Sequence, residues 1–163
     1  MFHVAREIEF CYGHRLLDYE GKCRYLHGHN AKAEIVLEGD RLNECGMLFD
    51  FGEIKRVVSG WIDENLDHRM LLRRDDPAVS PLRELGEPLV LLDVNPTAEN
   101  LAKLIFEFTA GQGFPVAEVR LWETPRCCAA YCREGETHPI IELISFSAAP
   151  SGRPAVSQQE DEP

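Results

Sequence analysis

Near the start of the chain, apolar and polar side chains alternate in two segments, a period typical of strands with one buried face. In residues 2–10 the apolar side chains share one parity, from Phe2 to Phe10. In residues 29–38 the alternation is stricter, with small or aliphatic residues at every second position. We therefore predict strands over both segments, and a short third strand over residues 47–51.

A first helix is predicted directly after these strands. Asp50 and Glu53 form a D-x-x-E capping box, a common start signal for helices. Apolar residues then recur at every third or fourth position, as on the buried face of a helix, and the pattern stops near Asn65. The apolar positions are Ile54, Val57, Val58, Trp61 and Ile62.

A second helix is predicted after residues 95–97. Two starts are open, because either Asn95 caps a helix whose first residue is Pro96, or Thr97 is the cap. The helix is expected to end at Gly111, since glycine is common just past helix ends. Its apolar face comprises Leu101, Leu104, Ile105 and Phe108.

The remaining segments complete the predicted fold. Residues 69–96 are rich in Arg, Asp and Pro and are interpreted as loop with one brief strand at 89–92. Residues 1–146 form the expected domain, and the small, polar residues 147–163 are expected to be a disordered tail. Further strands are predicted over residues 115–124, 127–132 and 140–144.

Strands that follow one another in pairs favour an antiparallel sheet, because hairpins join antiparallel neighbours. We expect an α+β fold with a four-stranded antiparallel sheet and two helices on one face. A sheet this small leaves its edge strands unpaired, which favours association between copies of the chain.

Composition restricts the class of protein. The chain has 163 residues and a formal net charge of -11, which disfavours binding to nucleic acid or to anionic membranes. No segment approaches the roughly 20 apolar residues of a membrane span, and the N-terminus lacks the features of a signal peptide. Six cysteines in such a chain are expected to be reduced thiols, so the cytoplasm is the expected location.

Three histidines form the strongest chemical signal. His27 and His29 are two residues apart in an extended segment, so their side chains should share a face, and His14 lies one loop upstream. Three imidazoles with one open position form a catalytic zinc site, whereas a structural site would need a fourth ligand, for which Cys23 and Cys11 are the candidates. Histidines without a metal are the alternative interpretation.

Other residues suggest acid–base chemistry. Cys23, four residues before His27, is either a reactive thiol near the metal or a buried structural one. Asp67 and His68 form either a carboxylate–imidazole pair that moves protons or a helix end with a stabilising histidine. The close-set Cys127, Cys128 and Cys132 fit no common zinc pattern, and core packing is favoured for them.

Glu123 shares the parity of apolar residues in its strand, and a carboxylate on an apolar face needs a partner. A planar heterocycle with two adjacent N–H donors would suit it; alternatively the strand ends first and Glu123 lies in solvent. Thr97 and Glu99 are explained by helix capping and by the helix dipole, so any ligand role for them is a weaker inference.

Together these residues resemble the family of 6-pyruvoyl-tetrahydropterin synthase and its bacterial relative, the 6-carboxy-tetrahydropterin synthase of queuosine biosynthesis. The similarity extends from about residue 3 to about residue 145. The run Phe10-Cys11-Tyr12-Gly13 departs from the small residues usual before the first ligand, a change that touches the pocket. The matching motifs are His14, Cys23-x3-His27-Gly28-His29, Phe49-Asp50-Phe51, Leu66-Asp67-His68, Pro96-Thr97-Ala98-Glu99-Asn100 and Trp122-Glu123-Thr124.

The resemblance implies the tunnelling fold, in which subunits join sheets edge to edge into barrels, usually as a homohexamer of two trimers with active sites between subunits. It implies one Zn²⁺ per subunit and the conversion of 7,8-dihydroneopterin triphosphate to 6-carboxy-tetrahydropterin, with release of acetaldehyde and triphosphate. The implied residues are His14, His27 and His29 for zinc, Cys23, Asp67 and His68 for proton transfer, and Glu123, Thr97 and Glu99 for the pterin ring.

The branch of the family is suggested by one spacing. Three residues separate Cys23 from His27, which resembles the carboxy-pterin branch, whereas the pyruvoyl enzymes of animals usually have a longer gap. A 6-pyruvoyl synthase and a non-catalytic zinc- or pterin-binding homologue remain alternatives. A zinc hydrolase is disfavoured because no carboxylate lies beside the ligands as in an H-E-x-x-H helix.

Overall fold

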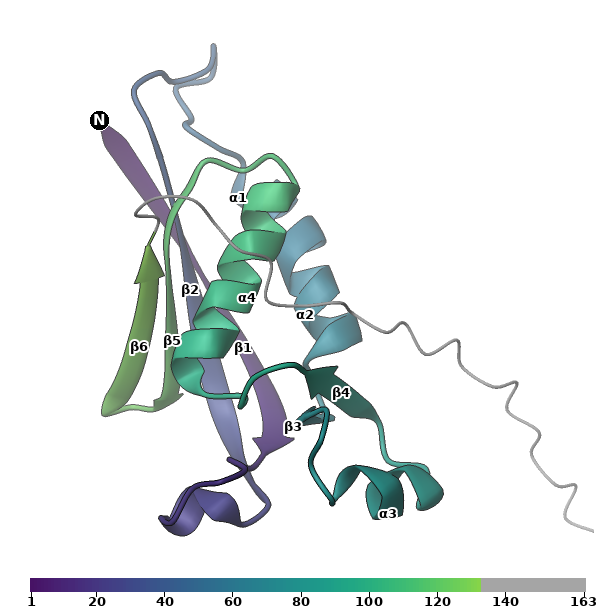
Figure 1. The fold of residues 1–163 in the computed structure, drawn as a ribbon. Helices are drawn as coiled ribbons and strands as arrows, with labels where there is room; N and C mark the ends of the chain where they lie inside the picture. The colour runs from purple at the N-terminus through teal and green to yellow at the C-terminus, as the bar shows by residue number, and fades with distance from the viewer. Residues whose placement is uncertain (133–163) are drawn as a thin grey trace, which may run out of the picture.

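One sheet organises the computed structural model, which describes residues 1–132 (Figure 1). Its strand order is β4-β3-β1-β2-β5-β6. The neighbours β1–β2, β2–β5 and β5–β6 are antiparallel, whereas β1–β3 and β3–β4 are parallel. The strands are β1 (Phe2–His14), β2 (His27–Gly39), β3 (Arg69–Arg73), β4 (Leu89–Leu92), β5 (Val116–Thr124) and β6 (Cys127–Cys132).

The predicted four-stranded antiparallel sheet is wrong, because the sheet of the described chain has six strands and is mixed. The additional strand β3 lies in residues 69–96, a segment that we interpreted as loop with one brief strand. Its two central residues, Leu71 and Leu72, are fully buried, so this short strand carries no alternating pattern that sequence could reveal. The brief strand predicted at 89–92 is confirmed as β4.

The third strand predicted over residues 47–51 is also wrong. Residues 47–50 lie outside any strand, and Phe51 is the first residue of a helix. The chain turns there because the Asp50 carboxylate accepts a hydrogen bond from the Gly52 N–H at 2.7 Å and so caps the helix. The capping signal in the sequence was therefore the stronger of two conflicting patterns.

Both predicted helices are confirmed and lie side by side on one face of the sheet (Figure 1). The second starts with Thr97 as its cap, which resolves the two alternatives. Helical structure is continuous through α1 (Phe51–Ile54), a π-helical segment (Lys55–Ser59) and α2 (Gly60–Asn65), and the other helices are α3 (Val79–Glu84), α4 (Ala98–Gly111) and a short 3₁₀ turn (Lys22–Arg24).

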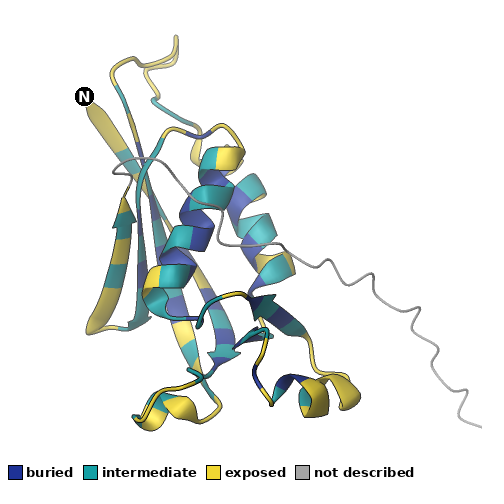
Figure 2. Ribbon diagram, viewed as in Figure 1, coloured by how far each residue is buried: buried dark blue, intermediate teal, exposed yellow. Residues whose placement is uncertain are grey.

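The hydrophobic core lies between these helices and the sheet (Figure 2). Ile35 of β2, Ile62 of α2 and Ile105 of α4 are fully buried there. The two helices contact each other through Trp61 and Phe108, whose rings stack with centroids 4.3 Å apart. Within residues 1–132, none of the helices has both the length and the apolar character that spanning a bilayer requires.

Two further predictions concern the C-terminal part. The strand over residues 127–132 is confirmed as β6, but core packing of its cysteines is wrong, since Cys127, Cys128 and Cys132 are all exposed. Within residues 1–132, β6 is an edge strand with β5 as its neighbour, and it turns Tyr131 rather than a thiol toward the core. The strand predicted over 140–144 and the tail over 147–163 lie outside the described residues.

Candidate functional site

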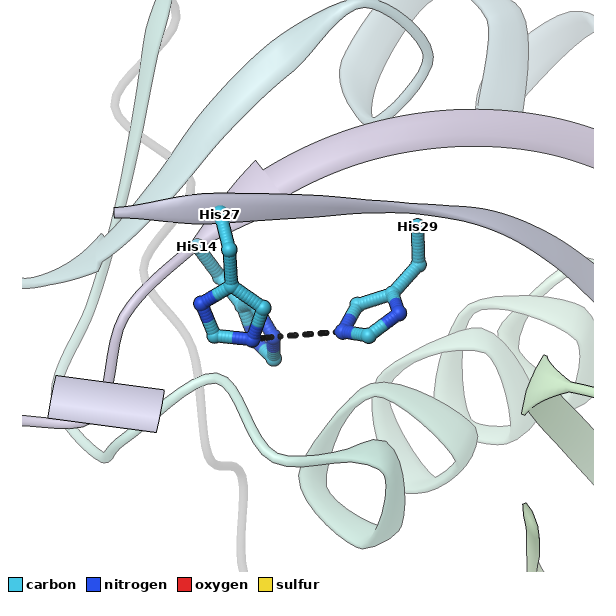
Figure 3. A group of neighbouring side chains, drawn as sticks. All are labelled: His14, His27 and His29. Atoms are coloured by element: carbon cyan, nitrogen blue, oxygen red, sulfur yellow. Dashed lines mark hydrogen bonds between the residues drawn. The ribbon is translucent and has the colours of Figure 1, made fainter. Parts of the chain in front are cut away.

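Three imidazoles converge on one point beneath β1 and β2 (Figure 3). The antiparallel register pairs His14 with His27, and the residue that pairs with His29 is Tyr12, on the same face. Nε2 of His14 lies 3.0 Å from Nε2 of His27 and 3.1 Å from Nε2 of His29. The strands thus extend further than the alternation predicted. The extensions carry His14 and His27, whereas His29 is the first residue of the predicted second strand.

Hydrogen bonds to backbone carbonyls orient two of the rings. Nδ1 of His14 donates to the Pro96 carbonyl at 2.7 Å, and Nδ1 of His27 donates to the Tyr25 carbonyl, also at 2.7 Å. Each ring therefore carries its proton on Nδ1 and presents the lone pair of Nε2 to the common point. Backbone carbonyls that hold the outer nitrogen in this way are a usual feature of metal-binding histidines.

The charge state of His14 agrees with this arrangement. The side chain is 3% exposed, and this burial lowers its pKa, against the opposing effects of the Pro96 carbonyl and of Glu123. A neutral imidazole is the form that binds a metal. Facing lone pairs need a cation or a shared proton between them. Nitrogens bound to zinc at about 2.0–2.1 Å in tetrahedral geometry lie about 3.3 Å apart, close to the spacing observed here.

The ligand set fits a site with an open position. Among the described residues, one mutually close group contains His14, His27 and His29 and no cysteine, and a separate group contains Cys11, Asp67 and His68. Cys11 belongs to the opposite parity of β1 from His14, and Cys23 lies in the 3₁₀ turn beyond the end of that strand. The structure therefore gives no support to either thiol as a fourth ligand, the arrangement that a structural site would need.

Glu123 lies beside the imidazoles. The strand β5 continues to Thr124, so the alternative that it ends before Glu123 is wrong. The β5–β6 register shifts between Trp122 and Thr124, an irregularity that re-aims side chains at strand ends. The carboxylate is 22% exposed, and its Oε1 lies 3.8 Å from Nε2 of His14. Two predicted parts of the site, the ligands and the carboxylate, thus meet within one chain.

Tyr12 is a site residue that sequence reasoning did not select. Its hydroxyl donates to Oε1 of Glu123 at 2.8 Å, and its ring lies edge-on to that of His14. Burial, followed by the charge and hydrogen bond of Glu123, raises the pKa of Tyr12, so the hydroxyl remains a donor. The signal was present, because a large residue stands two positions before the first ligand, where the family usually has a small one.

Asp67 and His68 form the expected pair, since Nδ1 of His68 donates to Oδ2 of Asp67 at 2.7 Å. The thiol next to this pair is that of Cys11, not Cys23. Partial burial opposes ionisation of Asp67, but hydrogen bonds from the Cys11 backbone and from His68 outweigh it and lower the pKa of the carboxyl. A group of Cys23, Asp67 and His68 stays a prediction.

Thr97 and Glu99 occupy the first turn of α4. The Thr97 hydroxyl accepts the Asn100 N–H at 3.4 Å, and Glu99 is an exposed acidic residue at the helix N-terminus. These contacts explain both residues structurally. Their helix start is nevertheless close to the ligands, because the carbonyl of Pro96 holds His14.

Comparisons with known proteins agree with this geometry. A family model described as 6-pyruvoyl tetrahydropterin synthase matches residues 3–134. The chain is 39% identical over 134 residues to the 6-carboxy-5,6,7,8-tetrahydropterin synthase of Rickettsia felis. The aligned region covers 78% of this chain and 97% of that protein. It is 30% identical over 140 residues to the protein of the same description from Haemophilus influenzae, with coverages of 80% and 99%.

Solved structures show the same fold. An uncharacterized protein from Wolinella succinogenes superimposes with a TM-score of 0.71 at 29% identity, covering 82% of this chain and 98% of that one. The 6-pyruvoyl tetrahydropterin synthase of Caenorhabditis elegans gives 0.62 at 25% identity, with coverages of 82% and 96%. The fold is thus that of the pterin synthases, a class of small α+β proteins. The chain belongs to the 6-pyruvoyl tetrahydropterin synthase family.

Proposed function

We propose that the chain is a zinc-dependent 6-carboxy-5,6,7,8-tetrahydropterin synthase that converts 7,8-dihydroneopterin triphosphate to 6-carboxy-tetrahydropterin, acetaldehyde and triphosphate. The observation that carries this proposal is the approach of Nε2 of His27 and of His29 to within 3.1 Å of Nε2 of His14, next to a half-buried carboxylate. Relatives described as 6-carboxy-5,6,7,8-tetrahydropterin synthases, at up to 39% identity, favour this product over the pyruvoyl one.

The proposed roles follow from the chemistry of each side chain. His14, His27 and His29 hold Zn²⁺, which when bound would polarise an oxygen of the substrate side chain. Cys23 and the Asp67–His68 pair move protons between side chain and ring. Glu123 accepts the N–H groups of the pterin, with Thr97 and Glu99 as neighbours of the ring.

Association between copies completes this proposed site. The Asp67–His68 pair contacts Cys11, which lies on the opposite parity of β1 from His14, so the pair serves the imidazoles of a neighbouring copy. Pairing of the edge strands β4 and β6 with other copies would supply that neighbour, as in a cytoplasmic homohexamer. A molar mass of six chains in solution is the expected measurement.

The decisive experiment is to incubate the zinc-loaded protein with 7,8-dihydroneopterin triphosphate and to identify the products by mass spectrometry. The proposal expects 6-carboxy-tetrahydropterin and one trapped acetaldehyde per turnover. A pyruvoyl product without acetaldehyde would identify the chain as a 6-pyruvoyl synthase, and pterin binding without turnover would identify a non-catalytic homologue.

A variant separates binding from chemistry. Cys23→Ala should keep zinc and pterin binding but lose turnover, because only a proton-transfer group is removed. Cys45→Ala is the matched control, since Cys45 is an exposed thiol on the loop after β2. Normal turnover in Cys23→Ala would refute the role of Cys23.

A further inference from the structure

Asn95 joins the loop after β1 to the turn before α4. The Leu17 N–H donates to Oδ1 of Asn95 at 2.9 Å, and Nδ2 of Asn95 donates to the Leu17 carbonyl, also at 2.9 Å. The sequence offered Asn95 as a helix cap, but Thr97 is the cap, so capping does not explain the side chain. An amide has both a donor and an acceptor, so the two bonds reproduce the pairing of residues on neighbouring strands.

The turn that carries Asn95 is fixed to α4 and holds the first imidazole. The Asn95 carbonyl accepts the Thr97 N–H at 2.8 Å and a hydrogen bond from Nδ2 of Asn100 at 2.9 Å. The next residue, Pro96, is buried, and its carbonyl accepts a hydrogen bond from Nδ1 of His14 at 2.7 Å. The turn is therefore the firmly held side of the contact.

The loop on the other side carries Cys23 and holds the second imidazole. The Leu16 N–H donates to the Cys23 carbonyl at 2.8 Å, which closes the loop next to Leu17. Two residues after Cys23, the Tyr25 carbonyl accepts a hydrogen bond from Nδ1 of His27 at 2.7 Å. The carbonyl that orients this second imidazole thus lies on the loop, whereas the carbonyl that orients the first lies on the turn.

We propose that Asn95 is a positioning residue whose side chain sets the distance between the turn and the loop. It thereby keeps the Tyr25 carbonyl where that carbonyl can orient His27, and it fixes the position of Cys23. Groups that orient a ligand ring strengthen metal binding, so the Asn95–Leu17 contact should contribute to zinc affinity. The inference rests on the proposed zinc site and not on the proposed reaction.

A surface ion pair is the alternative means of holding the loop. Nη2 of Arg73 donates to Oδ2 of Asp18 at 2.7 Å, but the Asp18 side chain is 74% exposed. Exposed ion pairs contribute little to stability because water and salt screen the charges. The bonds between Asn95 and Leu17 are partly buried, and their loss would leave two backbone groups of the loop without a partner. We therefore expect the loop to move when the amide is removed.

The test compares Asn95→Ala and Asn95→Gln with the control Asn43→Ala. Asn43 also holds a loop with its side chain, because its Oδ1 accepts the N–H groups of Cys45 and Met47. That loop follows β2, at the opposite end of the strand from the histidines. Asn95→Ala removes both bonds to the loop, whereas Asn95→Gln keeps the amide and lengthens its stem by one methylene group.

The first measurement is the zinc Kd, from competition with a chromophoric chelator at a temperature where circular dichroism shows each variant folded. Both Asn95 variants should bind zinc about tenfold more weakly than the wild type, and Asn43→Ala should bind it normally. The second measurement is alkylation of the metal-free protein by iodoacetamide, read by peptide mass spectrometry. The partly buried Cys23 should react several-fold faster in both Asn95 variants, with the exposed Cys45 unchanged, because a released loop opens more often.

Three results would overturn the inference. A wild-type zinc Kd in both Asn95 variants would show that the contact does not support the site. An equal loss of affinity in Asn43→Ala would show a general effect of loosened loops. Unchanged alkylation of Cys23 would show that the amide does not hold the loop. Alkylation needs neither zinc nor pterin, so it decides the role of Asn95 even if the wild type binds no zinc and the proposed function fails.

Discussion

Tyr12 donates a hydrogen bond of 2.8 Å to the carboxylate of Glu123, and this contact closes the space between the carboxylate and the three imidazoles. Oε1 of Glu123 lies 3.8 Å from Nε2 of His14, a gap in which no bicyclic ring fits. A pterin that uses both oxygens of Glu123 would therefore have to share Oε1 with the Tyr12 hydroxyl. We therefore expect Tyr12 to compete with the proposed ligand for this oxygen.

Tyr12→Phe should accordingly bind the pterin more tightly. The ring that packs on His14 is kept, and only the competing hydrogen bond is lost. Since a hydrogen bond contributes about 1 kcal/mol net, the Kd should fall by roughly fivefold in calorimetry. The control is Tyr19→Phe, at an exposed tyrosine of the loop before β2. A higher Kd for Tyr12→Phe would instead make Tyr12 a positioning residue for the carboxylate.

Glu123→Gln tests the carboxylate itself. The amide keeps the size of the side chain but presents only one acceptor oxygen, so it cannot receive two parallel N–H groups. Pterin affinity should fall by on the order of tenfold, because hydrogen bonds to charged groups contribute about 1.5–3 kcal/mol. Zinc content should not change. Equal pterin affinity in calorimetry would remove Glu123 from the proposed ring contacts.

The sequence predicted the proximity of the three histidines better than it predicted the sheet. Alternation marks strands that bury one face, so it located β1 and β2 and placed His27 and His29 on the buried side. It could not locate β3, because Leu71 and Leu72 of that strand are both buried. It also could not decide whether residues 47–51 form a strand or lead into a helix that Asp50 caps. Proximity across the sheet, as between Cys11 and His68, depends on the path of the loop after α2 and leaves no local pattern in the sequence.

Removing a single imidazole should abolish metal binding. His27→Ala leaves two ring nitrogens, too few for the three-ligand site that zinc prefers in enzymes. Elemental analysis after dialysis should give one zinc per chain for the wild type and none for the variant. His3→Ala, at an exposed histidine of β1, is the control and should retain the metal. Unchanged zinc in His27→Ala would contradict the ligand assignment.

The Asp67 carboxyl should make stability depend on pH. Hydrogen bonds from Cys11 and His68 lower its pKa in the folded state, against the opposing effect of partial burial. A lowered folded pKa stabilises the protein above the unfolded value of about 3.9, and this contribution is lost as the pH falls through the folded pKa. The Tm difference between wild type and Asp67→Asn should therefore be largest near pH 7 and vanish at strongly acidic pH. A constant difference would show that the charge is not responsible.

A buried ion pair links the end of β1 to the turn before α3. Nε of Arg15, the residue after His14, donates to Oδ2 of Asp76 at 2.7 Å, and the Ala78 N–H donates to Oδ1 at 2.7 Å. The Asp76 side chain is 0% exposed, so Asp76→Ala leaves a partly buried N–H and a partly buried guanidinium without their acceptor.

Asp76→Ala removes a carboxylate that accepts two hydrogen bonds, one of them from a guanidinium that is 23% exposed, so the free energy of unfolding should fall by about 1.5–3 kcal/mol in urea titrations. Asp75→Ala is the matched control, because its neighbouring carboxylate is 66% exposed and contacts Arg73 at the surface, where ion pairs contribute little. Loss of the Arg15–Asp76 contact should also disturb His14, the residue before Arg15. Zinc affinity should therefore fall in Asp76→Ala and not in Asp75→Ala. Equal stability of the two variants would show that the Arg15–Asp76 contact does not hold this end of β1.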